Sequence, residues 1–280
     1  MKALRYVICD VFTDRALTGN QLAVFTNGSK LDAETMQALA REMNFSETTF
    51  VLPASAGGHA RIRIFTPLRE LPFAGHPILG SAFVIGGTVQ LDVLRLETAS
   101  GLVPVRLERE GARVAFGWMD QPLPKIETFG AGPALLAALG VERAALPIET
   151  YDNGLPKVMV ALESPEQVAR LKPDFSRLLE LPAEGFSVFA GSGKNYKTRM
   201  FAPGAGVNED PATGSAAGPL ALHLARHGRI GYGELIEIEQ GTEIGRPSTL
   251  YARVHGSNEA LERVEVGGSA VVVARGEFRF

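Results

Sequence analysis

The chain has 280 residues, of which 45% are hydrophobic and 21% are charged. That composition is typical of a folded globular protein with one large domain or two ordinary ones, and it argues against intrinsic disorder. The formal net charge of −3 gives no sign of a nucleic-acid-binding surface. A single cysteine, Cys9, excludes an internal disulfide, a zinc site built on paired cysteines and any mechanism that needs two thiols in one chain.

No segment of the sequence predicts secretion or insertion into a membrane. Arg5 and Asp10 interrupt the first apolar run, and no small-residue cleavage site follows it. The longest apolar stretch, 73–87, is too short to cross a bilayer and contains His76. We therefore expect a cytoplasmic protein with neither nucleic acid nor membrane as a partner.

Most of the sequence predicts short strands separated by turns, because many segments alternate apolar with polar residues. The strands follow one another and do not alternate one-for-one with helices, which disfavours a doubly wound parallel sheet. In chain order, the predicted strands are 4–10, 22–26, 48–52, 60–65, 94–98, 103–108, 113–118, 157–162, 186–190, 198–201, 236–239, 251–255 and 270–274.

Four helices are predicted among these strands. The segments 32–43 and 164–171 begin with capping residues, Asp32 in the first, and are expected at the surface. The segments 76–87 and 214–228 are apolar nearly all round in their first turns and rich in small residues. Helices of that kind are buried and approach their neighbours closely.

A similar phrase introduces each of the two buried helices. RIFTP at 63–67 precedes the first, and RMFAP at 199–203 precedes the second. This internal repeat predicts an α+β protein of two similar domains, each a curved, mostly antiparallel sheet or open barrel around one buried helix. We place the N-terminal domain at 1–120, which can also include the last strand at 266–280, and the C-terminal domain at 121–265.

The repeat also predicts where a functional site lies. Two buried helices that begin at equivalent points of two halves can aim both N-termini into one cleft, where unpaired N–H groups suit a substrate carboxylate. The first entry point, GHP at 75–77, presents the imidazole of His76. The second, EDPATGS at 209–215, presents the carboxylate of Asp210 beside a Gly-Ser turn.

Several segments together resemble the PhzF family of phenazine-biosynthesis-like proteins, which shares the fold of diaminopimelate epimerase. The resemblance runs from about residue 8 to about residue 250, with the motifs in the family's order and spacing. The segments that carry it are DVFTDRALTGNQLAVF, NFSETTFV, FTPLRELPFAGHPILG, FAPGAGVNEDPATGSAAG and QGTEIGRPS.

The resemblance implies a cofactor-free isomerase that moves a proton along a small cyclic carboxylate. The epimerase relatives carry cysteines at the two helix entries, whereas this chain has Gly75 and Asp210 there. The family pattern also implies a homodimer without a metal or other cofactor. It assigns catalytic roles to Glu47, His76 and Asp210, and substrate binding to Asn20, Gly75, Gly214 and Ser215.

Two residues depart from the family pattern. Gln21 stands where a proline is usual, and Ile78 stands where a threonine is usual. Neither replaces an acid–base group, but both can alter the shape of the pocket, so the identity of the substrate is the weaker inference.

The implied chemistry is reasonable for the residues around Glu47. An allylic 1,3-proton shift needs one group that takes a proton from one carbon and returns it two carbons away. A carboxylate can serve if an apolar, closed site raises its pKa. Glu47 lies between Phe45 and the apolar pair Phe50 and Val51, so such surroundings are expected.

Three readings of the function remain open at this point. The first is an isomerase acting on a small cyclic amino acid that resembles trans-2,3-dihydro-3-hydroxyanthranilate. The second is a protein of the same fold that binds a small carboxylate or a protein without turnover, and the third is a racemase that uses Glu47 and Asp210 as opposed acid and base.

His223 and His227 have the spacing of helical metal ligands but lack an obvious third ligand, so we expect them on the helix surface.

Overall fold

The computed structural model describes residues 3–279, and they form a strand-rich chain with few helices. The helices are α1 (Ala33–Met43), α2 (Gly75–Gly86), α3 (Gly132–Leu139), α4 (Pro165–Ala169), α5 (Phe175–Leu179) and α6 (Gly214–Arg226). The strands are β1 (Ala3–Val11), β2 (Asn20–Phe25), β3 (Glu47–Leu52), β4 (Ala60–Phe65), β5 (Glu70–Leu71), β6 (Val93–Thr98), β7 (Gly101–Glu110), β8 (Arg113–Gln121), β9 (Lys125–Thr128), β10 (Glu149–Asp152), β11 (Pro156–Ala161), β12 (Phe186–Ser192), β13 (Asn195–Ala202), β14 (Val207–Asp210), β15 (Leu235–Gln240), β16 (Ser248–Gly256), β17 (Leu261–Gly268) and β18 (Ala270–Arg279).

The chain divides into two compact units. The first runs to Asp120 and takes up the chain again from Gly267, and the second is Gln121–Val266. Strand β18 therefore belongs with the N-terminal strands, where it pairs antiparallel with β1 from Ala3 opposite Arg279 to Val11 opposite Ala270.

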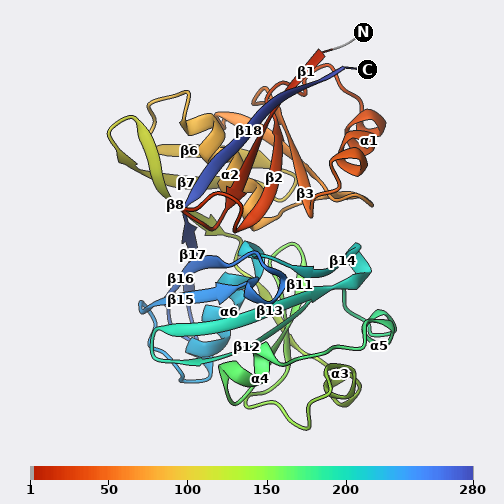
Figure 1. Ribbon diagram of the computed structural model, residues 1–280. Coiled ribbons are helices and arrows are strands. Elements are labelled where there is room, and N and C mark those ends of the chain that lie inside the picture. The colour runs from red at the N-terminus through yellow and green to blue at the C-terminus, as the bar shows by residue number, and fades with distance from the viewer. Residues whose placement is uncertain (1–2, 280) are drawn as a thin grey trace. The chain divides into compact units, whose positions relative to one another are not determined.

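The sheet of the first unit is mostly antiparallel and curves around α2 (Figure 1). Its strands lie in the order β18, β1, β2, β3, β4, β6, β7 and β8, with the short β5 paired to β4. Two neighbouring pairs, β2 with β3 and β4 with β6, are parallel. Helix α1 packs against β3 and β4, where its buried stripe includes Met36 and Leu39.

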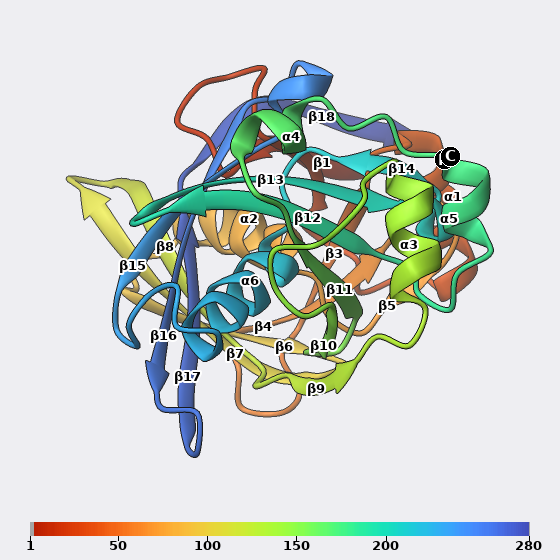
Figure 2. The same ribbon diagram turned by 90° about the horizontal axis from the view of Figure 1, so that it is seen from below.

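The second unit repeats this connectivity. Its strands lie in the order β9, β10, β11, β12, β13, β15 and β16, with β14 paired to β13. The parallel pairs are β11 with β12 and β13 with β15, the counterparts of β2 with β3 and β4 with β6. Helix α6 follows β14 as α2 follows β5, and Figure 2 shows it among the strands of this unit.

Both central helices are buried on nearly every side, as their sequences predict. Ten of the twelve residues of α2 and twelve of the thirteen of α6 are buried. Small residues allow the close packing, since a Cβ at Gly80 would lie 2.6 Å from a methyl of Leu22 and 2.7 Å from one of Val11. The burial of so much apolar surface makes each helix the centre of its unit's core.

The predicted α+β class with mostly antiparallel sheet is confirmed. The structure adds helices α3 and α5 and strands β5, β9, β10, β14 and β17, which the sequence patterns had not predicted. Within residues 3–279, no helix combines the length and the apolar character that crossing a bilayer requires.

Candidate active site

Three of the predicted site residues meet at one end of the first unit. Asn20 begins β2 and Glu47 begins β3, and these strands run parallel with Leu22 opposite Glu47. The first turn of α2 brings His76 to them. The parallel pairing explains the meeting, because parallel strands place their N-terminal residues at the same edge of a sheet.

The imidazole of His76 is the centre of this group. Its Nδ1 lies 3.2 Å from the amide Nδ2 of Asn20 and 3.5 Å from a carboxylate oxygen of Glu47. Asn20 is 1% exposed and His76 is 3% exposed, whereas the side chain of Glu47 keeps 16% of its surface accessible. The carboxylate is therefore the member of the group that a molecule from solvent can reach most readily.

Burial keeps His76 neutral. The loss of hydration lowers the pKa of the imidazole to about 3, although a hydrogen bond with the backbone of Gln21 acts in the opposite direction. Glu47 thus stands beside a neutral ring, and the two do not form an ion pair near pH 7. Among residues 3–279, no hydrogen-bond partner faces Nε2 of His76, although the atom is buried. A bound molecule is the ordinary way to satisfy such an atom.

The loop that leads into Asn20 has a strained backbone. Phe12 and Leu17 both adopt the left-handed region, with φ of 62° and 69°, which few non-glycine residues occupy. Gly19 has φ of 70°, and a Cβ there would lie 2.5 Å from the carbonyl oxygen of Val11. The structure therefore requires glycine just before Asn20, and strain of this kind is often found at functional sites.

In the second unit, Asp210 is held by a compact hydrogen-bonded loop. It ends β14, is 8% exposed, and accepts a hydrogen bond of 2.5 Å from the hydroxyl of Thr213. The buried amide of Gln240 ties this loop to β15. Its Nε2 donates to the backbone carbonyl of Asp210 at 2.7 Å, and its Oε1 accepts from the backbone N–H of Thr213 at 3.1 Å.

Gly214 and Ser215 form the first turn of α6, and two buried amides fix their carbonyl groups. Gln121 donates to the carbonyl of Gly214 at 2.7 Å, and Asn153 donates to that of Ser215 at 2.9 Å. These supporting amides, like Gln240, were missed by the sequence analysis. Each is an isolated polar residue in or beside a strand, and no local pattern distinguishes it from a solvated one.

Neither central helix has a side-chain cap at its N-terminus. Ala74 occupies the cap position of α2, and the hydroxyl of Thr213, at the cap of α6, is engaged with Asp210. Gly75 and Gly214 are the first residues of these helices. The partial positive charge of a helix N-terminus therefore favours an anion, such as a carboxylate, near their N–H groups. The predicted site residues thus fall into two groups, with Asn20, Glu47, Gly75 and His76 in the first unit and Asp210, Gly214 and Ser215 in the second.

One grouping in the described chain has the composition of a metal site. Ligand atoms of Glu149, His223 and His227 all lie within 4.8 Å of one another. The same Glu149 oxygen, however, accepts a hydrogen bond from Tyr151 at 2.8 Å and lies 3.3 Å from the guanidinium of Arg226. Since the arginine charge repels a cation, the grouping is a hydrogen-bonded network around a carboxylate.

The expectation that His223 lies on the helix surface is wrong. Its side chain is fully buried, whereas His227 is partly exposed. Burial is the main cause that lowers the pKa of His223 to about 4, and the neighbouring His227 acts in the same direction. The physical reason is that α6 stays buried on all sides as far as Ala225, well beyond the first turns on which the expectation rested.

Comparison with known proteins agrees with the fold. Residues 9–276 match the family described as phenazine biosynthesis-like protein. The chain is 51% identical to the trans-2,3-dihydro-3-hydroxyanthranilate isomerase of Pseudomonas aeruginosa over 97% of this chain and 98% of the relative. A PhzF-family protein of Bacillus anthracis has a similar structure, with a TM-score of 0.87, 26% identity and 100% coverage of both chains.

A more distant structure shows how far the fold extends. A hydroxyproline epimerase from Agrobacterium vitis matches with a TM-score of 0.67 and 12% identity, over 98% of this chain and 92% of the epimerase. The two units with like connectivity, each around a buried helix, therefore define an epimerase-like fold. The chain belongs to the PhzF family of phenazine biosynthesis-like proteins, and it is an isomerase.

Proposed function

We propose that the chain catalyses a cofactor-independent proton shift on a small cyclic carboxylate that resembles trans-2,3-dihydro-3-hydroxyanthranilate. The observation that carries the proposal is the placement of Glu47 3.5 Å from a buried, neutral His76 at the start of α2. The 51% identity to an isomerase of that substrate supports the choice of substrate class.

In the proposed reaction, the Glu47 carboxylate removes a proton from one carbon of the substrate. The double bond moves by one position, and the same carboxyl group returns the proton to the carbon two positions away. One C–H bond breaks and another forms, so the composition of the molecule is unchanged and no oxidant or reductant is required. His76 contributes Nε2 as a contact for the substrate. Asn20 orients the imidazole ring of His76 through the contact with its Nδ1.

We assign the group of Asp210, Gly214 and Ser215 to the same substrate, because it starts at the equivalent point of the repeat. The N–H groups at Gly75, Gly214 and Ser215 would hold the carboxylate, for which helix N-termini are suited. Asp210 would orient an amine or hydroxyl of the substrate, or tune the carboxyl group of Glu47. A substrate that is held at several points reacts faster because its reacting carbon is positioned against the base.

We further propose that the enzyme works as a cytoplasmic homodimer. The family resemblance supports the dimer, and sedimentation showing a monomer at micromolar concentrations would remove that part of the proposal.

The substitution Glu47→Gln tests the proposed base, since it keeps the size of the side chain and removes the acid–base function. Turnover of trans-2,3-dihydro-3-hydroxyanthranilate should fall by about 10²–10⁴-fold with little change in substrate affinity. Glu42→Gln, an exposed change on α1 in the same unit, is the matched control and should leave turnover unchanged.

Turnover in heavy water gives a second readout. Deuterium should enter the product at the carbon that receives the proton, at least in part. Near-full turnover by the Glu47→Gln protein contradicts the assignment of the base. Binding of the substrate without any turnover by the wild type contradicts the enzymatic proposal itself.

A further inference from the structure

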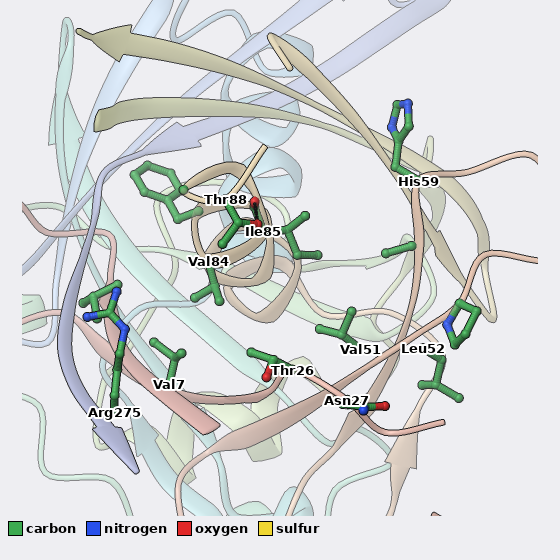
Figure 3. Close-up of a pocket in the computed structure, with 15 residues that line it drawn as sticks. Val7, Thr26, Asn27, Val51, Leu52, His59, Val84, Ile85, Thr88 and Arg275 are labelled. Atoms are coloured by element: carbon green, nitrogen blue, oxygen red, sulfur yellow. Dashed lines mark hydrogen bonds between the residues drawn. The ribbon is translucent and has the colours of Figure 1, made fainter. Parts of the chain in front are cut away.

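A pocket of about 490 Å³ opens in the first unit at the C-terminal end of α2 (Figure 3). It lies between the last turn of this helix, around Val84 and Thr88, and the ends of the strands that surround it. Small-molecule sites usually occupy about 300–1,000 Å³. His76 begins the same helix eight residues before Val84, which is about 12 Å along the axis at the α-helical rise. The pocket is therefore separate from the proposed catalytic group.

The interior of the pocket is apolar. Val7, Ala60 and Phe83 are buried side chains among its lining residues. Val84 of α2 and Val51 of β3 are half-buried and face the same space (Figure 3). An occupant with an apolar body would shield these groups from water, which is favourable at about 25 cal/mol for each Å² removed from solvent.

The charge at the pocket is positive. Arg275 of β18 lines one side (Figure 3), and no aspartate or glutamate is among the lining residues. Within residues 3–279, the guanidinium of Arg275 has no ion-pair partner, in contrast to Arg279 on the same strand, which contacts Glu277 at 2.8 Å. An arginine without a carboxylate beside an apolar space is suited to an anion, because guanidinium and carboxylate form paired hydrogen bonds.

The helix end limits how much negative charge the pocket can accept. The C-terminus of a helix carries a partial negative charge. Two of the backbone carbonyls there are engaged, since that of Phe83 accepts from Gly87 and that of Ile85 accepts from Thr88. These hydrogen bonds reduce the negative potential at the helix end, but the helix dipole still disfavours a multiply charged anion. A monoanion fits both features.

We propose that this pocket is a binding site for a small monocarboxylate with a compact aromatic or branched apolar body. The carboxylate contacts Arg275, and the body packs against Phe83 and Val84. The site is distinct from the residues that perform the isomerisation, so its occupation does not require the substrate.

Benzoate is a suitable probe, and its binding can be followed by calorimetry and by chemical-shift changes of backbone amides. The amides around Val84 and Thr88 should shift, and benzyl alcohol, which lacks the charge, should bind about tenfold more weakly. Arg275→Gln should weaken benzoate binding about tenfold, the loss expected for one hydrogen-bonded charge pair near the surface. Arg279→Gln, the matched control, should leave binding unchanged.

A second variant fills the pocket from an exposed position. Thr26 follows β2, lines the pocket and is exposed. Thr26→Trp should abolish benzoate binding while circular dichroism shows a folded protein. Benzoate binding that survives both Arg275→Gln and Thr26→Trp overturns the proposal. So does binding that shifts the amides of Glu47 and His76 and leaves those of α2's last turn unmoved, because the probe would then occupy the proposed catalytic group.

Discussion

The guanidinium of Arg199 and the carboxylate of Glu209 form two parallel hydrogen bonds, each 2.8 Å long, between β13 and β14. The first unit contains the same arrangement, since Arg63 on β4 makes two hydrogen bonds of 2.7 Å with Glu70 on β5. In each unit, the arginine also lies about 5 Å from the ring of the phenylalanine two residues further along. The repeated R-x-F-x-P phrase thus corresponds to one repeated contact that fixes the strand before the central helix.

The two pairs differ in exposure, and this difference predicts unequal effects on stability. Arg199 and Glu209 keep 9% and 8% of their side-chain surface exposed, whereas Arg63 and Glu70 keep 19% and 41%. Glu209→Gln leaves a buried guanidinium without its counter-charge and should cost about 3–5 kcal/mol in the free energy of unfolding. Glu70→Gln, the matched change in the other unit, should cost about 1 kcal/mol or less.

Urea unfolding followed by far-ultraviolet circular dichroism measures both costs. Equal losses in the two variants would show that burial does not govern the strength of these pairs.

The repeat and the central helices could be predicted because they depend on local features of the sequence. The apolar, small-residue character of α2 and α6 and the repeated phrase before each were visible without coordinates. The short strands β9 and β14, with four residues each, are too short for a pattern to show. Helix α3 is apolar on most sides, so it has no amphipathic period, although the glycine at its C-cap, Gly140, was an available signal.

The internal repeat predicted His76 as a site residue, but Asn20 and Glu47 of the proposed catalytic group could be predicted only through the resemblance to a family. Nothing in the local sequence joins Asn20, Glu47 and His76, which become neighbours through the parallel pairing of β2 with β3. The amide of Gln240 illustrates the remaining limit. It is 30 residues from Asp210 in the sequence, and only the pairing of β13 with β15 brings it to the loop.

Gln240 is predicted to position Asp210, since its three hydrogen bonds hold the loop from Asp210 to Thr213. Gln240→Leu leaves the buried carbonyl of Asp210 and the partly buried N–H of Thr213 without their partner, so we expect about 1–3 kcal/mol lower stability. Turnover should fall about tenfold or more because the loop can move. Glu237→Gln, an exposed change on the same strand, is the control.

A double-mutant cycle that combines Gln240→Leu with Asp210→Asn distinguishes a positioning role of Gln240 from a merely structural one. If Gln240 acts through Asp210, the double variant should lose less turnover than the product of the two single losses. Losses that multiply fully would count against a positioning role.

Chelation of metals should leave the proposed turnover unchanged. The network around Glu149 contains the charge of Arg226 3.3 Å from the carboxylate oxygen, and the proposed proton shift uses only side chains. Dialysis against EDTA, followed by assay with and without added Zn²⁺, measures the effect. A loss of activity on dialysis that added metal restores would contradict the expectation.

His76 should make the protein less stable as the pH falls below about 6.5. Its pKa is lowered to about 3 in the folded protein by burial, whereas an exposed histidine in the unfolded chain has an ordinary value of about 6.5. Between these values the unfolded state binds a proton that the folded state does not, so protonation favours unfolding by up to about 1.4 kcal/mol per pH unit. The contribution of the neutral ring is fully present above pH 6.5 and is lost progressively down to about pH 3.

Comparison of the wild type with His76→Asn isolates this contribution from that of the other buried histidine, His223. The stability of the wild type should fall more steeply than that of the variant between pH 6.5 and 4, as measured by urea unfolding at several pH values. The exposed control, His59→Gln, should show the same slope of the unfolding free energy against pH as the wild type.

Nuclear magnetic resonance of the imidazole gives a direct check, since the ring of His76 should remain neutral at pH 5. A His76 that titrates near pH 6.5 would contradict the buried, neutral state and leave Glu47 beside a cation, which is a different starting point for proton transfer.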